Sequence, residues 1–229
     1  MPAMRLRAIL FDYGGTLDGA GSHWLDRFAR LYEGAGLVLP FDRLRDAFDH
    51  ATHCAYTEPH VAELGLQALI EFHGARQLER LGVHDSELAG QVVAAFVRIS
   101  RAGLEASRGV LSRLRHRVAL GVISNFYGNV ARILDEAGVA PLLTTIVDSN
   151  RVGLSKPDPA IFALAVRRVG CAPAEALYVG DSFEKDIIGA RRAGLRTAWV
   201  VGATERVCPA PELVDVRLRC LEDLESLVA

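Results

Sequence analysis

The 229-residue sequence has little lysine, no paired cysteine motif and no long apolar run. Lysine occurs only at Lys156 and Lys185, so any chemistry that needs an amine has two candidates. The four cysteines form no C-x-x-C pair, which favours free thiols in a reducing compartment over a disulfide or zinc framework. No apolar stretch approaches the roughly 20 residues of a membrane-spanning helix.

The charge balance is also close to even: 28 acidic and 26 basic residues give a net charge of −2. A balance of this kind excludes a broad basic surface for nucleic acid. The apolar run from Leu6 to Phe11 is too short for the core of a signal peptide, so a cytoplasmic protein is expected. We therefore predict a small-molecule partner, no contact with nucleic acid or membrane, and a monomer or homodimer.

Apolar runs alternate with helical patterns over most of the sequence. The runs that predict strands are 6–11, 118–123, 144–148, 177–179, 197–201 and, more weakly, 214–218. Helical patterns of about 10 to 15 residues separate the later runs, and a terminal helix is predicted over 221–228. Strands that alternate with helices are typical of βαβ units, so we expect an α/β protein with a Rossmann-like parallel sheet.

One long segment interrupts this alternation after the first strand. From about residue 19 to 103 the apolar residues recur at helical spacing, with turn-like breaks near 36–40, 59, 82 and 103. We interpret this segment as an inserted bundle of helices. The predicted domains are a core formed by residues 1–18 and 105–229 and a helical cap formed by residues 19–104.

Polar residues follow the predicted strands, and ligands in an open parallel sheet bind beyond the carboxyl ends of the strands. These residues are Asp12, Gly14, Gly15, Ser124, Asn125, Lys156, Asp181 and Asp186. Clustered carboxylates repel each other unless a cation neutralises them, and their hard oxygen atoms suit Mg²⁺. Lysine and exposed glycine amides bind phosphate oxygens. The set therefore predicts a phosphoryl-transfer site in which one carboxylate attacks phosphorus.

Four ordered motifs carry a resemblance to a known family. They are D-Y-G-G-T at 12–16, S-N at 124–125, K-P at 156–157 and G-D-S-F-E-K-D at 180–186. Together they resemble the motifs of the haloacid dehalogenase-like hydrolase superfamily. The helical insert resembles its C1-type cap in position and character.

The resemblance implies a role for each matching residue. It makes Asp12 the nucleophile and a Mg²⁺ ligand, Lys156 the group that orients Asp12, and Ser124 the partner of the transferring phosphoryl group. It adds Asn125 and Gly15 to the substrate-binding residues, together with Ser124 and Lys156. It completes the metal site with the Gly14 carbonyl, Asp181 and Asp186.

Gly14 departs from the family pattern, because phosphatases of the superfamily carry a second aspartate there as general acid and base. Three hypotheses remain open. The protein is a Mg²⁺-dependent phosphohydrolase of reduced power or special substrate; or a non-phosphatase, dehalogenase-like hydrolase; or a weakly catalytic protein that binds a phosphorylated ligand or a partner. A leaving group of low pKa, such as an acyl or aryl group, needs less protonation.

Several further side chains are candidates for the site. Asp18 and His23 are candidates for the missing acid and base; the alternative and favoured interpretation is a turn or helix cap for Asp18 and a solvated loop for His23. Aromatic residues at 24, 28, 56 and 72 are candidates to line a substrate pocket or to fill the core of the cap. Phe126 and Tyr127 are candidates to reach the same pocket or to pack at the start of a helix.

Overall fold

The computed structural model describes residues 6–19, 21–202 and 206–228. Its strands are β1 (Ala8–Phe11), β2 (Ala119–Ser124), β3 (Thr145–Asp148), β4 (Ala176–Gly180), β5 (Arg196–Val200) and β6 (Val216–Leu218). All pair in parallel, in the order β3-β2-β1-β4-β5-β6. The prediction of an α/β fold with a parallel sheet is confirmed.

Two apolar layers cover the sheet, because side chains alternate between its faces. Ala8 and Leu10 of β1 face α7 (Pro159–Val169) and α8 (Gly189–Arg192). Ile9 and Phe11 face the opposite layer, which contains the end of α4 (Ser86–Leu114) and α5 (Val130–Glu136). A short helix, α6 (Ser149–Val152), follows β3. The segment at 221–227, predicted as a helix, forms a 3₁₀-helix.

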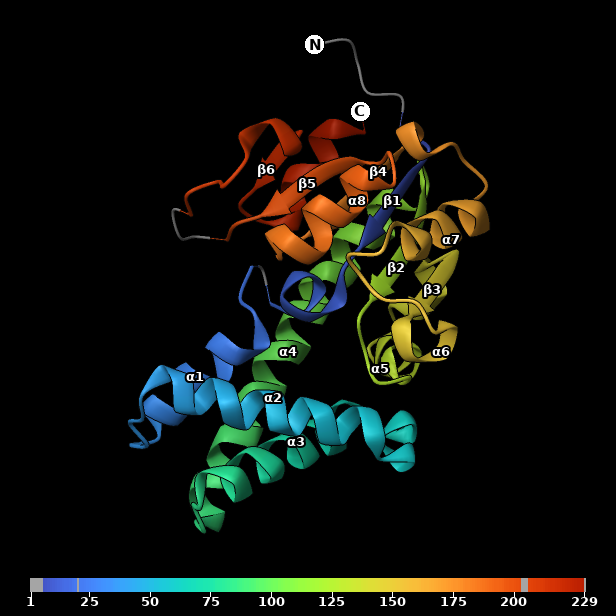
Figure 1. Cartoon of the computed structure of the whole chain (residues 1–229). Helices are drawn as coiled ribbons and strands as arrows, with labels where there is room; N and C mark the ends of the chain where they lie inside the picture. The colour runs from blue at the N-terminus through green and yellow to red at the C-terminus, as the bar shows by residue number, and fades with distance from the viewer. Residues whose placement is uncertain (1–5, 20, 203–205, 229) are drawn as a thin grey trace.

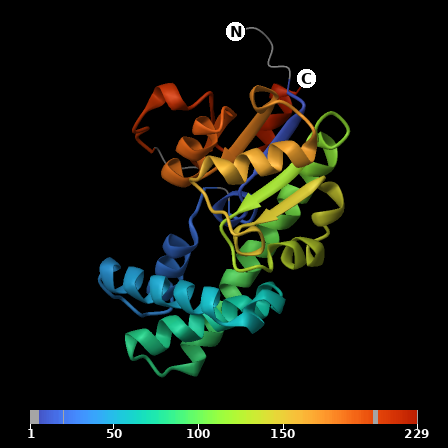
Figure 2. The same cartoon turned by 45° about the vertical axis from the view of Figure 1, so that its right-hand side comes forward.

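The insert between β1 and β2 is helical, and it stands apart from the sheet in both views (Figures 1 and 2). It contains α1 (Trp24–Gly34), α2 (Phe41–Thr57) and α3 (Leu66–Leu81), and α4 joins it to the core. Its apolar core is continuous with one side of the sheet. Among the described residues, no helix has the length and apolar character needed to cross a bilayer.

The turn expected near Gly103 is absent, because α4 runs unbroken through this position. A β-carbon at Gly103 would lie 2.5 Å from the carbonyl oxygen of Asp18. Glycine here allows the helix to approach the segment after β1 closely, rather than ending the helix. The predicted limit of the cap at residue 104 therefore falls inside a continuous helix, and the domain limits stay a prediction.

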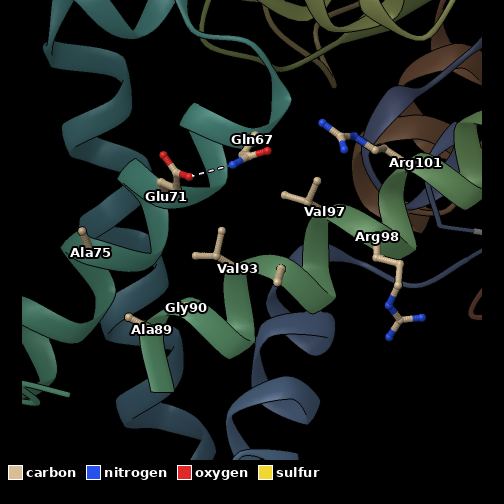
Figure 3. Close-up of a pocket in the computed structure, with 10 residues that line it drawn as sticks. Gln67, Glu71, Ala75, Ala89, Gly90, Val93, Val97, Arg98 and Arg101 are labelled. Atoms are coloured by element: carbon tan, nitrogen blue, oxygen red, sulfur yellow. Dashed lines mark hydrogen bonds between the residues drawn. The ribbon is translucent and has the colours of Figure 1, made fainter. Parts of the chain in front are cut away.

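A cavity of about 600 Å³ lies between α3 and α4 in the cap. Figure 3 shows small and apolar side chains such as Ala75, Ala89 and Val93 along it, with Arg98 and Arg101 at one end. It contains none of the predicted site residues. All of these except Gly15 line a second cavity.

Candidate active site

The predicted site residues meet at the carboxyl ends of the strands. Asp12 directly follows β1, Ser124 ends β2, and Asp181 directly follows β4. Lys156 arrives from the segment between α6 and α7, and Asp186 from the helical turn after Asp181. All five side chains are buried, yet all line one cavity of about 320 Å³ between the core and the cap.

Three carboxylates form the floor of this cavity. Asp12, Asp181 and Asp186 each offer an oxygen atom, and these atoms lie within 4.8 Å of one another. Burial raises the pKa of Asp12 to about 6, against the attraction of Lys156, and the charge of Asp186 raises it further. Burial and the other two carboxylates also raise the pKa of Asp181 well above its usual value. This crowding of hard oxygen atoms suits a divalent cation such as Mg²⁺.

Lys156 joins two of these carboxylates. Its Nζ donates to Oδ1 of Asp12 and Oδ1 of Asp186, each at 2.6 Å. Burial lowers the pKa of Lys156, but the two carboxylates raise it by more, so its pKa lies above the ordinary value. The amine is therefore a fixed positive charge beside Asp12 at neutral pH.

Two neighbours hold Lys156 in place. The Asn125 side chain donates to the Lys156 carbonyl at 2.9 Å and accepts from the Lys156 amide at 2.8 Å. Tyr178 accepts from Lys156 Nζ at 3.0 Å, and its hydroxyl lies 3.2 Å from Asp186 Oδ1. Tyr178 was not predicted; the available signal was a tyrosine in an otherwise apolar strand, whose buried hydroxyl needs a polar partner.

The backbone after Asp12 turns tightly at Gly15, which has a φ of 92°. A β-carbon there would lie 2.5 Å from Oδ2 of Asp181. Thr16 also joins this turn to Asp181, because its hydroxyl donates to Asp181 Oδ1 at 3.5 Å. The turn thus brings the first motif against the acidic cluster.

The position of Gly14 faces an indole ring. A β-carbon at Gly14 would lie 3.4 Å from Nε1 of Trp24, which is ordinary contact distance. That N–H donates to Oδ2 of Asp18 at 2.8 Å. Asp18 is fully buried and also accepts from Arg27 and Ser100. Because these partners occupy its carboxylate, which does not line the cavity, the hypothesis that Asp18 replaces the missing acid is wrong.

Aromatic side chains line part of this cavity. Trp24 and Tyr56 come from the cap, and Phe126 and Tyr127 come from the segment after β2. His23 also lines the cavity, whereas the candidates at 28 and 72 do not. The inserted helices therefore contribute directly to the cavity that Asp12 lines.

Comparisons with known proteins identify the family. Residues 6–194 match the model of a family described as haloacid dehalogenase-like hydrolase. The phosphoserine phosphatase of Thermus thermophilus is 32% identical over 212 residues, which cover 85% of this chain and 81% of that protein.

Solved structures share the fold. The protein YfnB of Bacillus subtilis, bound to magnesium, aligns with a TM-score of 0.60 and 22% identity over 98% of this chain and 99% of that chain. A dehalogenase solved with an intermediate complex aligns with a TM-score of 0.67 and 17% identity over 100% and 99% of the two chains. At these identities the likeness supports the fold alone.

Proposed function

The chain belongs to the haloacid dehalogenase-like hydrolase family, and we propose that it is a Mg²⁺-dependent phosphohydrolase that acts on a small phosphorylated metabolite. Two relatives named as phosphatases and one named as a nucleotidase support a hydrolase of phosphatase type. The observation that carries the proposal is the Lys156 ammonium, which lies 2.6 Å from Asp12 and from Asp186 on the floor of the cavity.

In this proposal Asp12 is the nucleophile. Lys156 fixes the orientation of its carboxylate and keeps it ionised by charge attraction. One Asp12 oxygen attacks phosphorus while the bond from phosphorus to the leaving oxygen breaks, and that oxygen keeps the electron pair. Water then attacks phosphorus, releases inorganic phosphate and restores the Asp12 carboxylate, and its proton passes to solvent.

The remaining residues bind the phosphoryl group and the metal. Ser124, with Asn125, Gly15 and Lys156, receives the phosphoryl oxygens. Asp12, Asp181, Asp186 and the Gly14 carbonyl would hold Mg²⁺, which when bound supplies positive charge to the carboxylates and to the phosphate. We further propose that residues 19–104 act as a cap that closes over the cavity and selects the substrate.

Phosphate release from acetyl phosphate and from a phenyl phosphate, with and without Mg²⁺, tests this proposal. We expect turnover that requires Mg²⁺ and is abolished in Asp12→Asn. The matched control is Asp135→Asn, which removes an exposed carboxylate outside the cavity and should leave turnover unchanged.

Turnover in ¹⁸O-labelled water separates the proposal from the dehalogenase-like alternative. Attack of water on phosphorus puts the label in inorganic phosphate and none in Asp12. Cleavage of a carbon–halogen bond would leave an ester of Asp12, and attack of water on its carbonyl carbon would put the label in the Asp12 carboxylate. Halide release from a 2-haloacid with labelled Asp12 would replace our proposal. Binding of phosphate without any turnover would favour the binding-protein alternative.

A further inference from the structure

Four aromatic rings form a continuous wall above the carboxylates. Ring centroids lie 5.6 Å apart for Trp24 and Phe126, 4.8 Å for Phe126 and Tyr127, and 4.9 Å for Tyr56 and Tyr127. Tyr56 keeps 41% of its surface exposed, so this ring remains available to a ligand. The wall offers apolar contact immediately above Asp12, where the rest of a bound substrate must lie.

The same wall contains no strong proton donor at the position nearest the nucleophile. Gly14 has no side chain, and the ring that faces it belongs to Trp24, whose N–H is committed to Asp18 at 2.8 Å. The indole atom nearest this space is the nitrogen, 3.4 Å from a β-carbon at Gly14, and its hydrogen is already donated to Asp18. A leaving oxygen in this space would depart without receiving a proton from residue 14 or 24.

Outside the acidic cluster, Lys156 and the two tyrosines of the wall, the ionisable side chains along the cavity are exposed. His23 is exposed, and its Nδ1 accepts the Leu25 amide at 3.2 Å, which leaves only a weakly acidic N–H on the ring. Arg45, Asp49 and Lys185 line the cavity with exposed side chains.

From this geometry, and on the basis of the proposed function, we propose that the substrate is an aryl phosphate, the phosphate monoester of a phenol. The phosphoryl group lies on Asp12 and Lys156, and the ring packs against the wall of Trp24, Phe126, Tyr127 and Tyr56. The cavity of about 320 Å³ has room for one ring and its phosphate.

The chemistry of the leaving group is the second reason for an aryl ester. As the Asp12–phosphorus bond forms and the phosphorus–oxygen bond breaks, the phenol oxygen leaves with the electron pair as a phenolate. A phenol has a pKa of about 10, whereas an alkoxide is about as basic as hydroxide, whose conjugate acid has a pKa of about 15.7. A phenolate can therefore leave as an anion and take its proton from water at the cavity mouth, but an alkoxide needs an acid.

The dependence of kcat/KM on the acidity of the leaving group tests whether a general acid is missing. We would measure kcat/KM for phenyl phosphates with ring substituents of graded acidity, because kcat/KM covers the steps up to release of the phenol. In the unmodified protein log kcat/KM should fall steeply as the pKa of the phenol rises. In Gly14→Asp, whose β-carbon fits beside Trp24, the dependence should become shallow.

A matched pair of substrates tests the same point directly. O-Phospho-L-tyrosine and O-phospho-L-serine share an amino-acid backbone and differ in the leaving oxygen. We expect kcat/KM at least about 100-fold higher for the tyrosine ester, and a gain of about 100-fold on the serine ester in Gly14→Asp, within the usual range for general acid catalysis.

A variant at Tyr56 tests the ring wall. The comparison substrate is acetyl phosphate, whose acetate group leaves easily but has no ring. Tyr56→Ala should lower kcat/KM for phenyl phosphate relative to acetyl phosphate by about tenfold. Phe41→Ala is the control, because Phe41 lies on the same helix with the same 41% exposure but outside the cavity. It should leave the ratio unchanged.

A shallow leaving-group dependence in the unmodified protein, or equal kcat/KM for the two amino-acid esters, would overturn the aryl phosphate proposal while phosphatase function stood. If the ratio of kcat/KM for phenyl phosphate to that for acetyl phosphate stays unchanged in Tyr56→Ala, the substrate ring does not pack against the wall. Failure of every ester and of acetyl phosphate would instead overturn the proposed function itself.

Discussion

At position 15 the backbone takes a conformation that excludes a β-carbon for two separate reasons. The φ of 92° is unfavourable for residues other than glycine, and a β-carbon would meet Asp181 at 2.5 Å. We expect Gly15→Ala to lower the free energy of unfolding by about 1–2 kcal/mol. It should also weaken Mg²⁺ binding, because Asp181 must move.

The neighbouring glycine provides the matched control. Gly14 has φ −77° and ψ 114°, which any residue can adopt, and its β-carbon would make an ordinary contact with Trp24. Gly14→Ala should therefore keep both stability and Mg²⁺ affinity. Urea unfolding and calorimetric Mg²⁺ titration of the two variants measure the difference. Equal effects at both positions would contradict the role assigned to Gly15.

At the scale of one element, α4 contains glycines with opposite roles. Gly90 lies beside the cap cavity (Figure 3), and a β-carbon there would have no neighbour within 4 Å outside its own helix. Gly90→Ala should raise the free energy of unfolding by about 0.5–1 kcal/mol through helix propensity. Gly103→Ala should lower it by about 1–3 kcal/mol, because the new methyl group overlaps the Asp18 carbonyl. Urea denaturation of the two variants is the measurement, and stabilisation by both would contradict the packing at Gly103.

A buried histidine in α3 makes the stability of the protein depend on pH. His73 is fully buried, lies 2.7 Å from the Gln77 side chain and stacks on Phe28. Burial lowers its pKa from 6.5 to about 3. Between these values the unfolded chain binds a proton at this site and the folded chain does not, so stability falls as the pH falls.

The slope of the free energy of unfolding against pH measures the contribution of His73 separately from that of other groups. Between pH 6 and pH 4 the free energy of unfolding should fall more steeply in the unmodified protein than in His73→Gln, by up to about 1.4 kcal/mol per pH unit. His116→Gln replaces an exposed histidine and should keep the original slope. Parallel slopes for the unmodified protein and His73→Gln, from urea unfolding at each pH, would show that His73 is charged in the fold.

At the scale of the whole molecule, the sheet was predictable because its strands are apolar runs flanked by turn residues. The run at 6–11 became β1 at 8–11, and the run at 144–148 became β3 at 145–148. Helix ends were less predictable, because tertiary contacts set them. The helix predicted between the runs at 118–123 and 144–148 begins at Val130, where the Asp148 side chain accepts from the Gly128 and Val130 amides.

The gathering of the acidic residues was also predictable, since parallel strands end at one edge of the sheet. The surroundings of Gly14 were not. Asp18 meets Arg27 on α1 and Ser100, which lies 82 residues further along the chain on α4. Such pairings depend on how the cap helices pack, and no local pattern in the sequence encodes them.

The acidic cluster couples the stability of the whole chain to both pH and metal. Burial raises the pKa of Asp12 to about 6 and that of Asp181 well above its ordinary value. Without metal, the folded state therefore binds more protons than the unfolded state above pH 3.8, and these groups make stability fall as the pH rises. Mg²⁺ should reverse this loss, because it binds the ionised carboxylates of the folded state alone.

The melting temperature should therefore rise with Mg²⁺, and by more at pH 7.5 than at pH 5.5. At 100 times the dissociation constant the gain is about 2.7 kcal/mol, or roughly 5–10 °C for a chain of this size. Asp181→Asn should melt higher than the unmodified protein in EDTA at pH 7.5, since it removes one of three crowded, buried carboxyl groups, but should lose the response to Mg²⁺. Asp135→Asn should behave as the unmodified protein. A full Mg²⁺ response in Asp181→Asn would exclude Asp181 from the metal site, and a response that does not change with pH would mean that the cluster is already ionised in the metal-free fold.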